Sequence, residues 1–302
     1  MSLSKDTNDN NSLEYFIPHF GVLKLDSITT KLRVVFDAST ITNSGFSLNH
    51  FQCTGPPLQH DILSIVTRFR QYPIVVSADI IKMYRQILIH PDDRSFQKIL
   101  WRNTPTEDIQ CYTLNTVTYG MASAPYLALR CLKQLALDCQ NTLPSVADII
   151  NRDFYVDDLL TGFDSVHQAL TTCKEIKHIL ESGRFKLHKW NSNSVEVLKS
   201  LNRDDSSNNI LTFGNNMESK ILGIRWISES DVLQYYIKLP KGDSNHVTKR
   251  SILSEVSKLY DPLGLLAPCI IVSKILLQHL WTLEIGWDEG VSDELREKWC
   301  AF

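Results

Sequence analysis

Two adjacent aspartates, Asp157 and Asp158, are the residues of this 302-residue sequence best suited to do chemistry. They lie between two β-prone runs, 153–156 and 159–163, and aspartate is a poor strand former but a common turn former. We therefore predict a tight hairpin with both carboxylates at its tip. Adjacent carboxylates disfavour each other's ionisation, and a divalent cation is the usual partner that offsets this. An acidic turn exposed to water is the alternative interpretation.

A third carboxylate, Asp79, follows the apolar run 74–78, which is typical of a buried central strand. A lone aspartate at the end of a strand is most often a turn or cap residue. Two-metal phosphoryl transfer, however, needs carboxylates from different elements that converge on cations about 3.5–4 Å apart. A strand that ends in Asp79 beside a hairpin with Asp157 and Asp158 at its tip would supply three such ligands.

The composition, 43% hydrophobic and 22% charged, is that of an ordinary globular protein of one large or two modest domains. No apolar run reaches the length of a membrane span, and the polar segment 1–12, expected to be disordered, resembles neither a signal nor a transit peptide. Seven cysteines without a C-x-x-C pair favour free thiols in an intracellular protein over a zinc site. The net charge of −3 argues mildly against nucleic-acid binding, although basic residues recur throughout the chain.

The residue pattern predicts an α+β protein, with antiparallel strands and covering helices followed by a helical region. Strands or extended segments are predicted over 15–25, 31–37, 74–78, 83–89, 97–101, 111–118, 185–190, 221–227 and 233–239. Helices are predicted over 58–70, 124–139, 164–183 and 268–283 and around 252–259. Ser123 and either Asp164 or Ser165 are the expected caps of the second and third of these helices.

Several ordered blocks resemble the palm of reverse transcriptases, most closely that of Bel/Pao-type long-terminal-repeat retrotransposons. The blocks are Tyr155-Val156-Asp157-Asp158 with Asp79 upstream, and residues 18–24, 31–39, 118–125, 189–193 and 260–268. The resemblance runs from about Tyr15 to Trp287. It implies a right-hand polymerase fold, with partial fingers and the palm over 13–240 and a C-terminally truncated, thumb-like helical region over 241–302.

The same resemblance implies the roles of the site residues. Asp79, Asp157 and Asp158 would be catalytic and would bind two Mg²⁺ ions, with Mn²⁺ as a substitute. The nucleotide-binding residues would be Lys31 and Arg33 on the triphosphate, Tyr84 as the gate against a ribose 2′-hydroxyl, Tyr119, Gly120, and Lys189 as proton donor to pyrophosphate. The primer or template would contact Tyr155, Leu222 and Gly223. Tyr119 departs from the glutamine of retroviral enzymes, so contact there would be through an aromatic face.

The implied activity is RNA-directed DNA polymerisation, a nucleotidyl transfer that extends a primer on an RNA or DNA template with deoxynucleoside triphosphates. No membrane partner is expected. In a full element the region would be fused to protease, ribonuclease H and integrase, and it would act in the cytoplasm, an element particle or the nucleus. Because few residues precede Arg33, the alternative is a catalytically inactive, truncated remnant that only binds nucleic acid. A palm polymerase with another template or sugar preference is the third hypothesis.

Overall fold

The computed structural model describes residues 1–4, 13–23, 31–203, 218–221, 224–235 and 247–302. By its contacts the chain divides into two units, Met1–Asp61 with Thr67–Ser207 and Ile62–Val66 with Asn208–Phe302. The sequence placed the boundary at 240/241 instead. The difference arises because strands after residue 217 form a sheet of their own and do not join the central sheet of the first unit.

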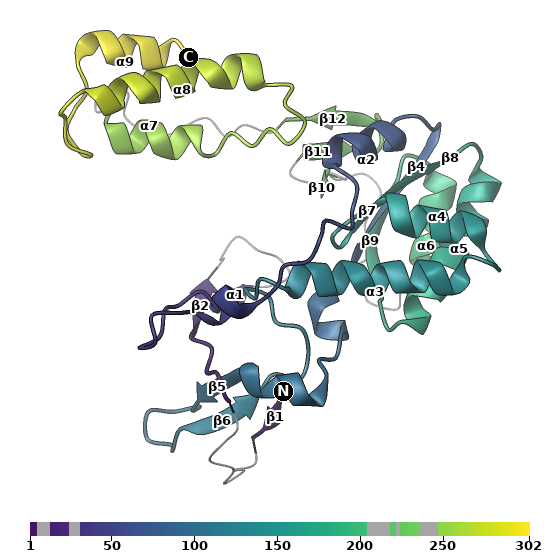
Figure 1. Ribbon diagram of the computed structural model, residues 1–302. Coiled ribbons are helices and arrows are strands. Elements are labelled where there is room, and N and C mark those ends of the chain that lie inside the picture. Colours follow the sequence, from purple (N-terminus) through teal and green to yellow (C-terminus); the bar gives the residue numbers. More distant parts are fainter. Residues whose placement is uncertain (5–12, 24–30, 204–217, 222–223, 236–246) are drawn as a thin grey trace. The chain divides into compact units, whose positions relative to one another are not determined.

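An antiparallel sheet with the strand order β7-β8-β4-β9 is the centre of the first unit (Figure 1). Its strands are β4 (Ile74–Ile80), β7 (Phe154–Tyr155), β8 (Asp158–Phe163) and β9 (Leu187–Ser192). β4 lies between β8 and β9 and is buried along most of its length, as its continuous apolar run predicted. The predicted hairpin is also present, as the β7–β8 pair, but its turn is formed by Val156 and Asp157, and Asp158 is the first residue of β8 instead of lying at the tip.

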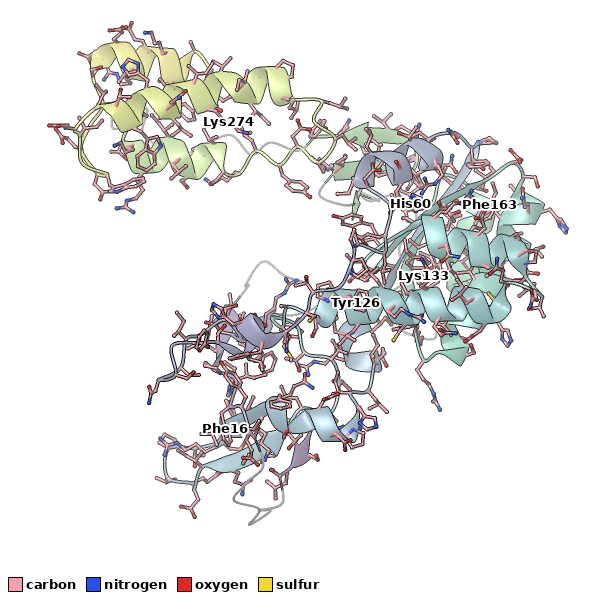
Figure 2. The ribbon with its side chains drawn as sticks, in the orientation of Figure 1. Phe16, His60, Tyr126, Lys133, Phe163 and Lys274 are labelled. Carbon is pink, nitrogen blue, oxygen red and sulfur yellow. The ribbon has the colours of Figure 1, made fainter. Side chains whose placement is uncertain are left out.

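Four helices share one hydrophobic core with this sheet. They are α3 (Ala124–Cys139), α4 (Pro144–Arg152), α5 (Val166–Ser182) and α6 (Val195–Arg203). Each of the first three buries one apolar stripe and exposes polar side chains, such as Lys133 of α3 (Figure 2), on the other side. Ser165 caps α5 by accepting a hydrogen bond from the Gln168 N–H at 3.3 Å, as predicted. Ser123 makes no such cap, and its hydroxyl donates a hydrogen bond to Gln52 Oε1.

A smaller core supports the strands that precede α3. Here β2 (His19–Leu23) pairs with β3 (Leu32–Phe36), and β5 (Lys98–Trp101) pairs with β6 (Gln110–Thr113). Ile17, Phe36, Ile99 and Leu114 fill the space between them. The short β1 (Ser2–Leu3) adds to β6, so part of the terminus that was expected to be disordered is in a strand; residues 5–12 lie outside the described ranges.

The predicted strand 83–89 was wrong, since this segment forms the 3₁₀ helix η1 (Met83–Gln86). Lys82 adopts a left-handed backbone at φ 46°, which turns the chain away from the direction of β4. The remaining short helices are α1 (Leu48–Phe51), α2 (Ile62–Phe69) and η2 (Pro91–Phe96).

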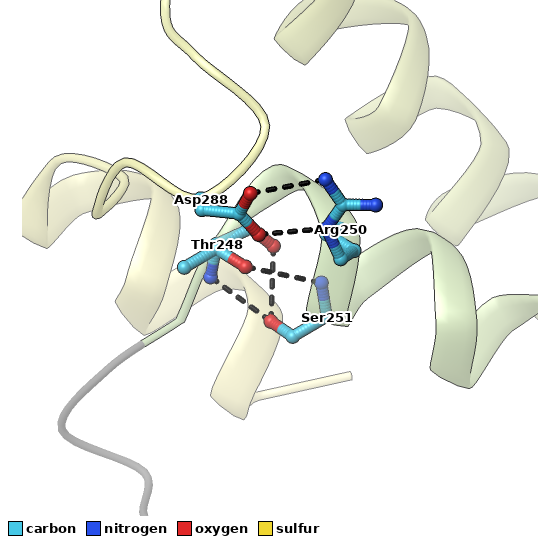
Figure 3. A network of polar contacts seen from close by, with 4 residues as sticks. All are labelled: Thr248, Arg250, Ser251 and Asp288. Atoms are coloured by element: carbon cyan, nitrogen blue, oxygen red, sulfur yellow. Dashed lines mark hydrogen bonds and ion pairs between the residues drawn. The ribbon is translucent and has the colours of Figure 1, made fainter.

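The second unit contains a small antiparallel sheet and helices. Its elements are β10 (Glu218–Ile221), β11 (Ile224–Ile227), β12 (Val232–Gln234), α7 (Lys249–Val256), α8 (Ala267–Thr282) and α9 (Asp293–Cys300). α7 begins at a capping box in which the hydroxyls of Thr248 and Ser251 bind each other's backbone N–H (Figure 3). Arg250 adds a bidentate pair with Asp288, at 2.6 and 3.0 Å (Figure 3).

The entry to the β7–β8 hairpin is held by a buried ion pair. The carboxylate of Asp153 accepts a hydrogen bond from Arg68 Nε at 3.0 Å and another from Thr161 Oγ1 at 2.9 Å. Arg68 also donates to the backbone oxygen of Arg152. Burial raises the pKa of Asp153, although the hydrogen bonds of Arg68 and Thr161 counteract part of that rise. These contacts fix where the acidic hairpin leaves α4.

We expect Arg68→Met to destabilise the first unit by about 3 kcal/mol, because it leaves the buried carboxylate of Asp153 without its cation. Native-state amide hydrogen exchange of β8 measures this loss directly. Adding Asp153→Asn should restore part of the stability, since the stranded charge is then removed. Equal exchange rates in the wild type and Arg68→Met would show that the pair does not hold the hairpin.

Candidate active site

The sheet register brings the three candidate carboxylates to one corner. Asp79 of β4 lies directly opposite Asp158 of β8. In an antiparallel pair, such residues have Cα atoms about 4.5–5.5 Å apart. Asp157 belongs to the adjoining turn, and its backbone oxygen accepts a hydrogen bond from the Ile80 N–H at 2.9 Å. Residues that are distant in the sequence therefore meet where β4 ends and the hairpin turns.

The hairpin turn itself is strained. Val156 has φ 56°, a left-handed conformation that is unusual for a β-branched residue. Its N–H donates to Gln59 Oε1 at 3.1 Å, and this contact helps to hold the turn in place. The strain is offset by the pairing of Tyr155 with Asp158 and by the Ile80–Asp157 hydrogen bond on the other side.

The carboxylates raise one another's proton affinity. Burial, together with the charges of Asp157 and Asp79, raises the pKa of Asp158 to about 7. Burial and the charge of Asp79 also raise the pKa of Asp157. Burial acts in the same direction on Asp79, but hydrogen bonds from His188 and Lys189 outweigh it and hold the pKa of Asp79 below its usual value. The corner thus concentrates negative charge that needs a cationic partner.

Two side chains of β9 contact Asp79, His188 through the register and Lys189 through a β-bulge. Lys189 Nζ lies 2.6 Å from Asp79 Oδ2, and His188 Nε2 lies 3.2 Å from the same oxygen. Neighbouring residues of a regular strand point to opposite faces, so both could not reach one carboxylate. In β9 the register shifts between Asn191, opposite Ser77, and His188, opposite Asp79, and Lys189 adopts φ 52° within the shift. The bulge re-aims Lys189 onto the carboxylate.

Sequence reasoning identified Lys189 but missed His188. Its position next to Lys189 was visible, but an alternating strand would have turned it away from the site. The β4–β9 register places His188 directly opposite Asp79, and the bulge that lets Lys189 reach the same carboxylate has no residue signature in β9.

Tyr84 of η1 is half-buried near the corner. Burial, and the negative charge of Asp157, raise the pKa of its hydroxyl. The side chain also packs against the main hydrophobic core. Its position is therefore compatible with both interpretations, a core aromatic and a gate beside the carboxylates.

The loop at Gly120 is built around close backbone contact. Gly120 has φ 92°, and a Cβ at this position would lie 2.1 Å from the backbone oxygen of Phe36, so glycine is required. Asn49 fixes the loop by donating to the Gly120 oxygen at 3.0 Å and accepting from the Ala122 N–H at 2.8 Å. The ring of Tyr119 meets Phe36 edge-on, with centroids 5.3 Å apart.

The other predicted contact residues have less defined surroundings. Lys31 and Arg33 are exposed, Arg33 on β3 opposite Val22. Tyr155 is half-buried in β7. Leu222 and Gly223 lie outside the described ranges, so the expected primer contact there stays a prediction.

Within the described part of the chain, no three His, Cys, Asp or Glu side chains are arranged to hold a metal ion as they stand. The chemistry of the corner nonetheless suits a hard cation, since its donors are carboxylate oxygens that lack enough positive partners.

No helix among the described residues is long and apolar enough to cross a membrane.

Comparison with known proteins places these features in a family. Residues 23–224 match the model "Reverse transcriptase (RNA-dependent DNA polymerase)", and residues 248–302 match the model "Pao retrotransposon-like RNaseH-like domain". No curated protein matches the chain. Since the second match carries a different description, the thumb-like assignment of 241–302 stays a prediction.

Among solved structures, the chain is similar to a foamy viral protease-reverse transcriptase in complex with an RNA/DNA hybrid, with 16% identity and a TM-score of 0.58. The similarity covers 96% of this chain and 34% of that one. It supports the right-hand polymerase fold expected from the sequence. Because the family model spans most of the chain and includes the whole carboxylate corner, the protein belongs to the reverse transcriptase family, with its C-terminal region similar to Pao retrotransposons.

Proposed function

We propose that this protein is an RNA-directed DNA polymerase of a retrotransposon that extends a primer by two-metal nucleotidyl transfer. The observation that carries the proposal is the placement of Asp79 opposite Asp158, with Asp157 in the adjoining turn. Family membership supports the reaction class, and the similar foamy viral structure holds an RNA/DNA hybrid, the kind of duplex that such a reaction produces.

Asp79, Asp157 and Asp158 are the residues that would hold two Mg²⁺ ions, or Mn²⁺ in their place. Bound there, the metals would lower the pKa of the primer 3′-hydroxyl and neutralise charge on the triphosphate. The protein's own contribution is to keep the three carboxylates together against their repulsion, through the sheet register and the anchored turn. Lys31 and Arg33 are exposed cations that can engage the triphosphate of the incoming nucleotide.

Lys189 has two tasks in this proposal. Before metal binds, its ammonium neutralises Asp79, at 2.6 Å. With a divalent cation held by that carboxylate, Lys189 would be free to turn toward the triphosphate, where it could donate a proton to the leaving pyrophosphate. The exposed position of Lys189 gives its side chain room to make this exchange.

All three carboxylates are present and gathered at one corner, so no feature of the described residues favours the binding-only remnant over the polymerase.

A fusion to protease, ribonuclease H and integrase regions belongs to the same proposal, as do the template, the primer and the deoxynucleoside triphosphates. The Pao match of residues 248–302 supports an origin in such an element.

Asp157→Asn should abolish primer extension on an RNA template, with a loss of at least roughly a thousandfold, because a metal ligand is removed where charge develops in the transition state. The exposed loop residue Asp108, changed to Asn, is the matched control and should retain activity. A parallel assay on a DNA template measures template preference. Extension by Asp157→Asn at the control rate would refute the metal assignment.

Tyr84→Ala should relax sugar selection. If the ring blocks the ribose 2′-hydroxyl, discrimination between deoxy- and ribonucleotides falls roughly ten- to two-hundredfold, the range for one steric contact. Single-nucleotide incorporation kinetics measure kcat/KM for each sugar. Discrimination that stays at the wild-type level would leave Tyr84 as a core residue only.

Lys189→Met should tighten binding of Mn²⁺ to the protein without nucleic acid, by about fivefold, because the competing ammonium is removed and an exposed pair is worth roughly 1 kcal/mol. The same change should slow nucleotide incorporation, since the proton donor is lost. Isothermal titration calorimetry measures the Mn²⁺ affinity, and single-nucleotide incorporation kinetics measure the rate of incorporation. Weaker Mn²⁺ binding in Lys189→Met would contradict the exchange.

A further inference from the structure

Arg85 is the third member of a cluster formed with two aromatic rings. Its guanidinium carbon lies 5.3 Å from the ring centroid of Phe36 and 5.1 Å from that of Tyr119. Both distances are within the range of a cation–π interaction. The two rings also meet each other edge-on at 5.3 Å. The planar cation is therefore held by β3 on one side and by the Gly120 loop on the other.

This cation has no carboxylate within ion-pair distance among the residues that the structure describes. Other half-buried arginines of the first unit are matched by acceptors; Arg68, for example, pairs with Asp153. Aromatic faces stabilise the positive charge of Arg85 but leave its N–H donors unused. A guanidinium with free donors is suited to an anion, above all to phosphate, which it can bind through two parallel hydrogen bonds.

Arg85 also lies among the proposed nucleotide contacts. It follows Tyr84 directly on η1, and it touches Tyr119, next to Gly120. Tyr119 already engages Phe36 and Arg85, so its ring is not free on all sides for a nucleotide. The donor-rich group at this position is the arginine rather than the tyrosine.

We infer that Arg85 binds a phosphate of the incoming deoxynucleoside triphosphate, and that Phe36 and Tyr119 orient its guanidinium for this contact. The inference rests on the proposed polymerase function and adds a specific residue to its nucleotide site. Pre-orientation by two rings lowers the entropy lost when the side chain binds its anion. It also links strand β3 to the Gly120 loop through one side chain.

The test is equilibrium binding of the next correct deoxynucleoside triphosphate to protein loaded with a dideoxy-terminated primer–template, so that no bond can form. Arg85→Met keeps the apolar stem but removes the cation, Arg85→Lys keeps the charge but loses the planar fork, and Lys133→Gln, on the exposed face of α3, is the control (Figure 2). Arg85→Met should raise the nucleotide Kd roughly ten- to hundredfold, the range for a charged hydrogen bond. Arg85→Lys should recover part of this loss.

Two further readouts separate phosphate binding from a packing role. The dependence of nucleotide Kd on salt should become shallower in Arg85→Met, because one charged contact is lost. Affinity for the primer–template and the melting temperature should stay close to those of Lys133→Gln. Unchanged nucleotide Kd in Arg85→Met, or an equal loss in Arg85→Lys and Arg85→Met with an unaltered salt dependence, overturns the inference. If the wild type binds primer–template but no nucleotide, the proposed function itself fails, which is a distinct result.

Discussion

The structure depends on holding three carboxylates together at one corner of an antiparallel sheet. Their burial and mutual repulsion disfavour ionisation of Asp157 and Asp158. The protein meets this cost with the backbone: the register of β4 and β8 fixes Asp79 opposite Asp158, and a strained turn holds Asp157 beside them. Carboxylate oxygens gathered in this way are the donors that a hard divalent cation prefers.

The elements around the corner each serve this placement. Arg68 and Asp153 fix the start of the hairpin, and Gln59 holds its turn. The register places His188 opposite Asp79 and the bulge in β9 brings Lys189 to the same carboxylate, which thereby gains a positive partner. Under the proposed function, the contacts of Lys189 and His188 with Asp79 would give way to a cation.

Much of this could be predicted from local sequence. The apolar run that leads to Asp79 and the turn former Asp157 have strong local preferences, which the tertiary structure keeps, whereas Asp158 is the first residue of β8 instead of a turn residue. Helix α3 could also be predicted, with the bounds Ala124–Cys139, because Pro125 and a long apolar stripe indicate where it begins and which face it buries. The helices α4, α6 and α9 were not predicted, although Pro144 and the spacing of Val146, Ile149 and Ile150 did carry a signal for α4.

The features that could not be predicted from the sequence are those created by contacts between distant segments. The left-handed Lys82 converts an apparently β-prone segment into η1, and the bulge that re-aims Lys189 has no residue signature. The partnership of Arg85 with Phe36 and Tyr119 joins three separate segments and follows from packing alone. In each case a backbone irregularity or a long-range contact, and not a propensity, decides where a functional side chain lies.

The central claim is that this corner binds divalent cations by displacing Lys189 from Asp79. Anomalous diffraction from crystals grown with Mn²⁺, primer–template and nucleotide tests it most directly. The account predicts metal peaks about 2.0–2.3 Å from oxygens of Asp79, Asp157 and Asp158, with the Lys189 ammonium withdrawn from Asp79. Peaks located elsewhere, or a Lys189–Asp79 contact that persists unchanged beside bound nucleotide, would contradict it.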